Sequence, residues 1–272
     1  LINENDIDFN GYGLALSYAV SPKITLLTSA EKAVRMPGDS ELLGNTSGGI
    51  EPTYDLLPEN SNNFNLGFLL GTYILNKHSF NLEANYFIRD ISDLIIRGIS
   101  HSISDTYGYE NLGKVKSSGF DAELKYNYDN RFFVATNFSN FNARYNLRYD
   151  ENGSEYGHYG DRLRNTPYLT SNTYIEYKFN KLFKENSKFS VNYNFGYTHE
   201  FFRNWESYAS TGKAYIPTQA IHDFGASYTA PNNKTTLSFN AKNITDEQVF
   251  DNWAMQKPGR SFYIKLTYRP IF

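Results

Sequence analysis

Several things are scarce in this chain of 272 residues, and each scarcity excludes a class of protein. Cysteine is absent, which excludes a disulfide framework and thiolate chemistry. The net charge of -3 provides neither a basic field for nucleic acid nor the acidic run of a disordered tail. No apolar stretch reaches the roughly 20 residues of a membrane-spanning helix. The opening segment, LINENDIDFN, lacks the charged start and apolar core of a signal peptide.

Aromatic side chains, by contrast, are abundant. The chain holds 23 Tyr and 21 Phe but only 2 Met, and its mean hydropathy is low, at -0.55. A soluble core has little room for so many rings. A membrane β-barrel carries them on its outside, in girdles at the two interfaces, around a polar lumen. The composition therefore favours a barrel.

Apolar and polar positions alternate along most of the chain. Near its end, Phe262, Ile264, Leu266 and Tyr268 are each separated by one residue. Successive side chains of a strand point to opposite faces, so the pattern predicts strands with one apolar face. No convincing helical period is present. We expect about eleven strands, near residues 10–20, 24–34, 61–74, 79–97, 109–128, 131–147, 167–179, 188–203, 216–229, 234–244 and 260–271.

A soluble β-sandwich would show the same alternation, but the lengths of the connections favour the barrel. Short turns alternate without a break with long connections, near 35–60, 98–108, 148–166, 204–215 and 245–259. Outer-membrane barrels have tight turns on one rim and long loops on the other. The sequence therefore predicts an all-β, antiparallel, up-and-down transmembrane β-barrel.

The number of strands adds an expectation about length. With eleven antiparallel strands, the first and the last run in the same direction and cannot close a barrel except through a parallel seam. An open sheet would leave unpaired strand edges in lipid. We therefore expect residues 1–272 to be part of a longer chain that contributes an odd number of strands upstream.

Four segments resemble the C-terminal half of TonB-dependent outer-membrane receptors, and they stand in that family's order. They are AEKAVRMPGDSELLG with EPTYDLLPENSNNFNLGF, NYFIRDISDLIIR, ENLGKVKSSGFDAEL, and NITDEQVF with KPGRSFYIKLTYRPIF. The resemblance implies a 22-stranded barrel around an N-terminal plug. Residues 1–272 would then be the C-terminal part of the barrel, without the plug, the TonB-box peptide or the first barrel half.

The same resemblance implies a function and a set of partners. The intact protein would import a scarce nutrient across the bacterial outer membrane, energised by the TonB complex through the missing N-terminal part. A ferric siderophore is the first choice of cargo, and an oligosaccharide or haem is the alternative. A surface adhesin or lectin is the rival from another class. Membrane lipid and the barrel-assembly machinery would be further partners, and nucleic acid would not.

The final strand has a role of its own under this resemblance. It implies that the strand is the address that the barrel-assembly machinery reads, with Ile264, Leu266, Tyr268 and Phe272 as its apolar positions. The alternative is that Phe272 is only an aromatic residue at the lipid interface. The two interpretations are compatible.

The long connections hold the candidate ligand-binding residues. Arginine binds carboxylates and phosphates, and aromatic rings stack on sugars or chelates. The candidates are Arg148, His158, Arg162, Arg164, Trp205 and Trp253. The alternative for each is a solvated loop residue or an aromatic residue at the membrane interface.

Catalytic and metal chemistry have little support in the sequence. The partial motif VRMP and the histidines at 101, 158 and 199 are the only features that favour a haem receptor. No nucleophile and base stand in a distinctive arrangement, so we expect no enzyme. We also expect no resident cofactor and no metal site.

Overall fold

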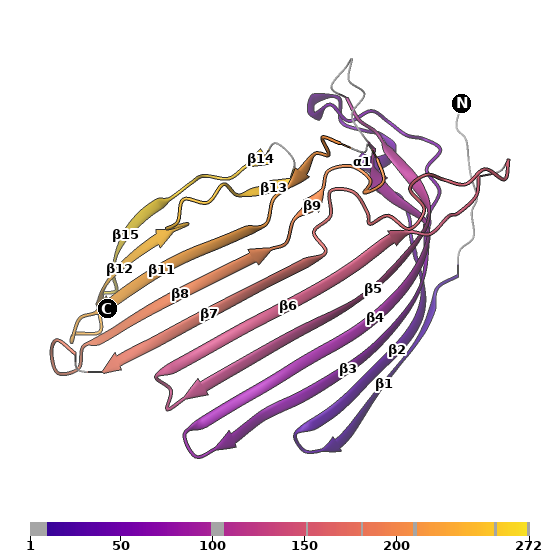
Figure 1. Ribbon diagram of the computed structural model, residues 1–272. Coiled ribbons are helices and arrows are strands. Elements are labelled where there is room, and N and C mark those ends of the chain that lie inside the picture. The colour runs from indigo at the N-terminus through magenta and orange to yellow at the C-terminus, as the bar shows by residue number, and fades with distance from the viewer. Residues whose placement is uncertain are drawn as a thin grey trace.

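The fold is an eleven-stranded antiparallel sheet, seen in a computed structural model that describes residues 10–98, 106–150, 152–180, 182–208, 211–252 and 255–270. Each strand pairs with its neighbours in chain order, and the sheet curves into an open wall (Figure 1). The eleven predicted strands are thereby confirmed. They are β1 (Tyr12–Ser21), β2 (Ile24–Arg35), β3 (Glu59–Leu75), β4 (His78–Arg97), β5 (Tyr109–Tyr128), β6 (Phe132–Tyr145), β7 (Leu169–Asn180), β8 (Lys188–Thr198), β11 (Gln219–Thr229), β12 (Thr235–Lys242) and β15 (Ser261–Tyr268).

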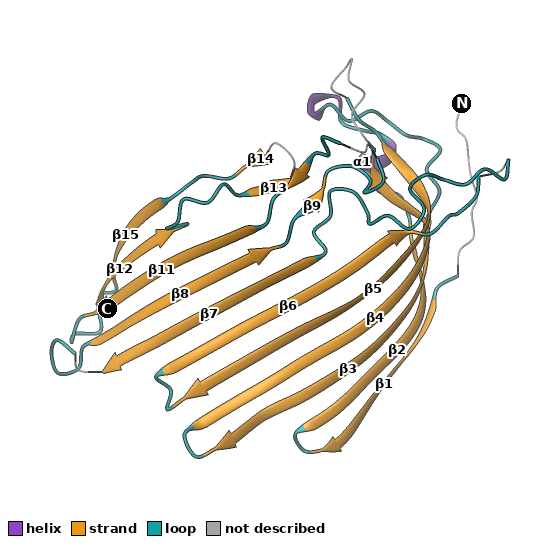
Figure 2. Ribbon diagram, in the orientation of Figure 1, coloured by secondary structure: helices purple, strands orange, loops and turns teal. Residues whose placement is uncertain are grey.

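Smaller elements lie in the long connections, on one rim of the wall (Figure 2). The single turn of helix α1 (Asp39–Leu42) and the 3-10 turn Thr46–Gly48 follow β2. Two-stranded ribbons are formed by β9 (Phe201–Phe202) with β10 (Tyr215–Ile216), and by β13 (Phe250–Asn252) with β14 (Met255–Gln256). Within the described ranges, no helix has the length and apolar character to cross a membrane.

One expected strand, 188–203, was too long. The strand β8 ends at Thr198, and Phe201 and Phe202 pair with the ribbon strand β10 instead. The neighbouring strand β7 begins only at Leu169, just after Pro167, so the last link between the two is the His199 amide donating to the Leu169 carbonyl at 3.0 Å. Proline has no amide hydrogen to extend a ladder. Beyond this point β7 provides no partner for the residues that follow β8.

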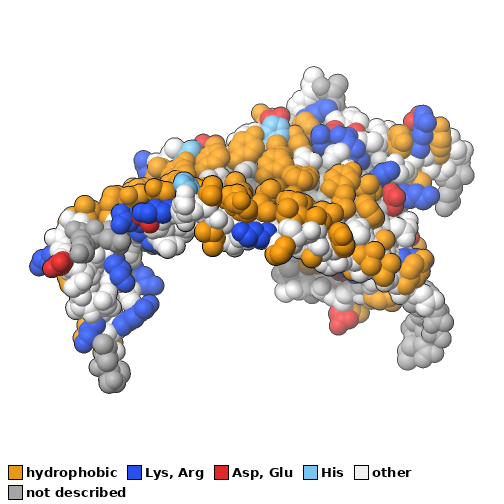
Figure 3. Space-filling model, turned by 90° about the horizontal axis from the view of Figure 1, so that it is seen from below, with side chains coloured by type: hydrophobic (Ala, Val, Ile, Leu, Met, Phe, Trp, Pro, Cys, Tyr) orange, Lys and Arg blue, Asp and Glu red, His pale blue; other side chains and the backbone are white. Residues whose placement is uncertain are grey.

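The two faces of the wall differ in chemistry. Across β1 to β5, the register aligns Leu16, Thr28, Leu66, Tyr86 and Phe120 in one row. The next row, on the opposite face, contains Asn85 and Asp121. Large apolar side chains of the first face remain exposed to the surroundings, and they lie along the outer surface of the arch in Figure 3. An apolar surface of this extent favours contact with lipid.

Several aromatic rings of the apolar face are exposed, as the strand pattern predicts. Tyr18, Phe64, Tyr128 and Tyr268 are exposed on the wall. Tyr228 is partly covered, because the ring of Phe183 from the preceding turn lies 5.6 Å from it.

The two edges of the wall have no strand partner among the described residues. The strand β1 pairs with β2 alone, and β15 pairs with β12 alone. Ile264, Leu266 and Tyr268 are exposed on β15. Phe272 lies outside the described residues. The role of this strand as an assembly address stays a prediction.

Candidate functional site at the long-loop rim

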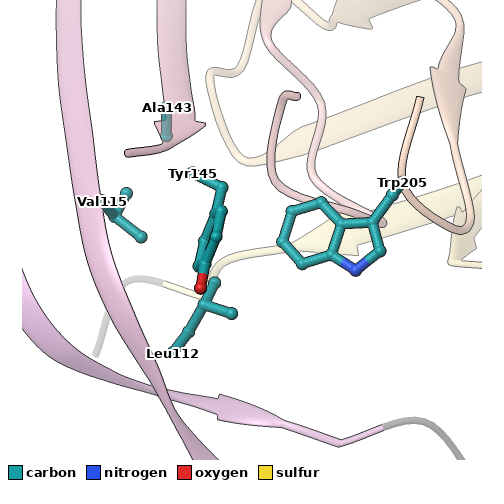
Figure 4. Close-up of a cluster of buried hydrophobic side chains, with 5 residues drawn as sticks. All are labelled: Leu112, Val115, Ala143, Tyr145 and Trp205. Atoms are coloured by element: carbon teal, nitrogen blue, oxygen red, sulfur yellow. The ribbon is translucent and has the colours of Figure 1, made fainter. Parts of the chain in front are cut away.

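A small apolar core holds the long connections against the ends of the central strands. It consists of Leu112, Val115, Ala143, Tyr145 and Trp205, all buried (Figure 4). The first four belong to β5 and β6, and Trp205 comes from the connection 199–218. At this rim β6 extends beyond its neighbour β7, whose pairing with it ends at Asn140 and Leu169. Trp205 is only 7% exposed, so this connection is folded down onto the strands.

His158 joins this core from the connection 146–168. Its ring lies 4.4 Å from that of Tyr145 and is stacked on Trp205 at 4.6 Å. Burial lowers the pKa of His158 below its ordinary value; Asp161 acts in the opposite direction, and Arg164 lowers it further. The imidazole is therefore neutral at neutral pH and acts as one of three packed rings.

Glu206 connects the same two long connections through charge. Its carboxylate accepts a hydrogen bond from Arg162 Nη1 at 2.6 Å and one from the Arg162 amide at 3.2 Å. The Arg144 guanidinium lies 3.7 Å from Glu206 Oε2, the same oxygen that accepts the Arg162 amide. Arg162 also lies over the Tyr168 ring, at 4.0 Å from its centre. One carboxylate thus binds a strand end and two connections together.

Arg164 ties this assembly to the ends of β4 and β5. It forms an ion pair with Glu110 at 2.5 Å and donates to the Arg97 carbonyl at 3.2 Å. Its side chain is 11% exposed. Arg162 and Arg164 therefore satisfy acidic and carbonyl groups of the chain itself.

Arg148 differs from the other two arginines because it is open to solvent. Its side chain is 54% exposed and pairs with Glu155, also exposed, at 3.0 Å. The guanidinium lies over the exposed rings of Tyr149 and Tyr159, at 5.3 and 5.6 Å. We call Arg148, Tyr149 and Tyr159 the Arg148 patch. It combines a cation with two accessible rings, which suits an anionic ligand that contains rings.

A second node fixes the connection 36–58. Arg35 at the end of β2 pairs with Glu59 at the start of β3, at 2.6 Å, and with Glu41 of α1, at 3.0 Å. Glu59 also accepts the Ile95 amide at 2.9 Å, and Glu41 accepts the Gly38 amide at 2.7 Å. The ion pair of Arg35 with Glu59 gives a physical reason why the chain contains both the segment AVRMP and the segment LPENS. The arginine of one and the glutamate of the other close the base of the connection.

Two hollows lie among these connections. The smaller, about 40 Å³, is lined by residues that include Arg162, Tyr168 and Glu206, and it has room for little more than water. The buried Arg162 Nε has no hydrogen-bond partner beside it. The larger, about 390 Å³, opens next to Arg164 and is bordered by Glu51 and Glu110.

The structure thus gathers four predicted residues, His158, Arg162, Arg164 and Trp205, and places Arg148 apart from them. Trp253 and His101 lie outside the described residues. His199 bonds Tyr197 Oη at 3.1 Å. In the described part of the chain, no group of three or more His, Asp and Glu could hold a metal.

Sequence reasoning missed the partners Glu206, Glu110 and Glu59. Glu59 and Glu110 lie within the segments that resemble the receptor family, but residue type does not reveal which arginine each one meets. Glu206 is a single acidic residue that nothing in the sequence distinguishes from other solvated carboxylates. The signal that was available was the recurrence of arginine in the connection 148–164, since several partly buried guanidinium groups require several acceptors.

Comparison with known proteins gives the family. The family "TonB dependent receptor-like, beta-barrel" matches residues 6–244. No curated protein sequence matches the chain.

Several solved structures share the fold. A variant of the ferric enterobactin receptor PfeA of Pseudomonas aeruginosa is 19% identical, with a TM-score of 0.63, over 95% of this chain and 40% of that one. The siderophore receptor PirA of Acinetobacter baumannii is 17% identical, with a TM-score of 0.64 and the same coverage. The copper transporter OprC is 14% identical, with a TM-score of 0.66, over 94% of this chain and 38% of that one.

The chain therefore spans about 40% of the length of each of these receptors. The identities are low, so these structures support the fold alone, whereas the family match covers most of the sequence. The chain belongs to the TonB-dependent receptor family and forms part of its β-barrel.

Proposed function

We propose that residues 1–272 are the C-terminal half of the 22-stranded barrel of a TonB-dependent receptor in the bacterial outer membrane. Eleven strands make half of such a barrel, and the free edges of β1 and β15 provide two seams for the other half. The coverage of about 40% of related receptors is consistent with this division. The plug and the first barrel half would belong to the rest of the protein.

The whole receptor would import a scarce nutrient, with energy supplied by the TonB complex acting on its N-terminal part. The family match over residues 6–244 is the observation that carries this proposal. The machinery that assembles outer-membrane barrels would read β15 as its address. A receptor of this kind is a transporter and needs no catalytic group.

A ferric siderophore is the cargo we propose first. Similar structures are described as a ferric enterobactin receptor, a siderophore receptor and a copper transporter, so the fold admits more than one cargo. The Arg148 patch supports an anionic chelate, because a solvent-accessible guanidinium beside two rings attracts both the charge and the aromatic groups of such a ligand. His158, Arg162, Arg164 and Trp205 would serve by holding the connections in place.

Uptake by the full-length receptor tests this proposal. A strain lacking the receptor is complemented with the wild type, and uptake of radiolabelled ferric siderophores is measured with haem and oligosaccharides as competitors. Arg148→Gln should lower siderophore uptake, while Lys114→Gln, an exposed site on β5, should not. Growth indifferent to iron limitation, or competition by glycans alone, would exclude the siderophore. Solubility without detergent would favour an adhesin or lectin.

A further inference from the structure

The short turns of the wall carry a net positive charge. Each of the five turns that join β1–β2, β3–β4, β5–β6, β7–β8 and β11–β12 contains a lysine or arginine, and another follows β15. The only acidic residues in these turns are Asp129 and Glu185. We call the described cations the basic rim: Lys23, Lys77, Arg131, Lys184, Lys234 and Arg269.

The opposite rim has the opposite balance. The connection 36–58 contains four acidic residues, Asp39, Glu41, Glu51 and Asp55, and no lysine or arginine. Together, the five long connections contain 14 acidic residues and 7 lysines or arginines, so the near-neutral total of -3 results from two rims of opposite sign. A balanced total charge conceals a field that runs along the strands.

The basic rim directly adjoins the apolar face. Lys23 Nζ lies 4.4 Å from the centre of the Tyr73 ring, and both side chains are exposed. In the next turns, Lys77 and Arg131 share the single carboxylate of Asp129, at 3.3 and 3.6 Å, and their side chains are 62% and 52% exposed. Phe183, beside Lys184, is also 62% exposed. Lys and Arg side chains recur in the view of the wall from below (Figure 3).

We propose that the basic rim binds the phosphate groups of anionic phospholipids in the leaflet that borders it. The inference rests on the proposed membrane location. Along the wall, an apolar face is followed by rings and then by cations, which is the order of hydrocarbon, interface and phosphate in a leaflet. A basic residue near an anionic leaflet is attracted to it. A soluble polyanion would not need the continuous apolar face beside the cations.

Lipid selectivity of the full-length receptor tests this inference. The rim variant Lys23→Gln/Lys77→Gln/Lys234→Gln is compared with a variant of equal charge at the other rim, Arg148→Gln/Lys213→Gln/Lys257→Gln. Each protein is reconstituted into vesicles of phosphatidylcholine alone or mixed with phosphatidylglycerol. Native mass spectrometry then gives the ratio of the two lipids that remain bound. Each removed rim lysine should lower the phosphatidylglycerol preference by roughly fivefold at low salt.

The outcomes separate the two proposals. A wild type that inserts into both vesicles and prefers phosphatidylglycerol, with the preference lost in the rim variant alone, supports the basic rim. If the wild type inserts but shows no preference for phosphatidylglycerol, or if both variants lose that preference equally, this inference is overturned and the membrane location stays intact. Failure to insert into either vesicle refutes both. If the rim mutations abolish retention on heparin but leave the lipid ratio unchanged, the occupant is a soluble polyanion and the inference is wrong.

Discussion

Removal of the Glu206 carboxylate should release the connection 146–168 from the strands. In Glu206→Ala, Arg162 loses the acceptor of its guanidinium at 2.6 Å and of its amide at 3.2 Å, and Arg144 loses its nearby charge. Hydrogen bonds to charged groups contribute about 1.5–3 kcal/mol each. The side chains of Arg162 and Glu206 are 30% and 24% exposed, so solvent screens part of the stabilisation that their pairing provides.

We therefore expect a net loss of about 2 kcal/mol in the free energy that docks this connection. That loss corresponds to roughly a 30-fold increase in the population of the undocked state. Hydrogen exchange of the full-length receptor measures it directly, because amides of a locally open segment exchange in proportion to its opening. Protection should fall by this factor in residues 146–168 and 199–218, and remain unchanged in β3 and β4.

Glu155→Ala is the matched control. Glu155 is also an acidic partner of an arginine in this connection, but its pair with Arg148 is exposed on both sides. Its removal should leave the exchange of the docked residues unchanged. If the two variants behave alike, or if Glu206→Ala has no effect, the proposed clamp is wrong.

Three other predictions concern the wall, the rings and the base of a connection. Gly119→Ala should destabilise the sheet by about 1–3 kcal/mol, measured by urea unfolding, because a Cβ there would overlap the Phe87 ring. The pKa of His158 is lowered, so docking should be fully stable above about pH 6.5 and should weaken as the pH falls below it, as reported by Trp205 fluorescence. Arg35→Gln should increase hydrogen exchange in residues 36–58, because Glu41 and Glu59 lose their shared cation.

Each of these predictions has its own control. Gly196→Ala should be neutral, since the nearest atom to its Cβ would be Asn172 Oδ1 at 3.6 Å; equal destabilisation at both glycines would refute the packing argument. His158→Gln should abolish the acid transition, and a transition that persists must have another origin. Lys32→Gln, three residues before Arg35, should leave exchange in the connection unchanged; a similar increase there would point to a general charge effect.

The sequence predicted the wall much better than the site. The two-residue period fixes which side chains share a face, and this local information was sufficient for all eleven strands. It failed at Phe201 and Phe202, where apolar residues continue but the partner strand β7 does not. Strand length there depends on a neighbour that is distant in sequence.

The candidate site depends almost wholly on such distant contacts. The chain places Glu110 and Arg164 together across 54 positions, and Arg162 and Glu206 across 44. Residue type and spacing identified the arginines and Trp205 as candidates for one region. They could not show that Arg162 and Arg164 pair with partly buried acidic groups while Arg148 faces solvent, because this difference results from how the connections fold onto Tyr145 and its neighbours.

If this chain forms a wall between lipid and a polar lumen, neighbouring side chains of one strand must meet different surroundings. Single cysteines can test it at Phe120→Cys, Asp121→Cys, Ala122→Cys and Glu123→Cys of β5, in the full-length receptor reconstituted in vesicles, with a nitroxide attached to each. The account predicts that collisions with oxygen, which concentrates in lipid, and with a water-soluble nickel chelate alternate along the four positions. Labels at 120 and 122 should meet oxygen, and those at 121 and 123 the chelate. Equal access of the chelate at all four positions would contradict the account.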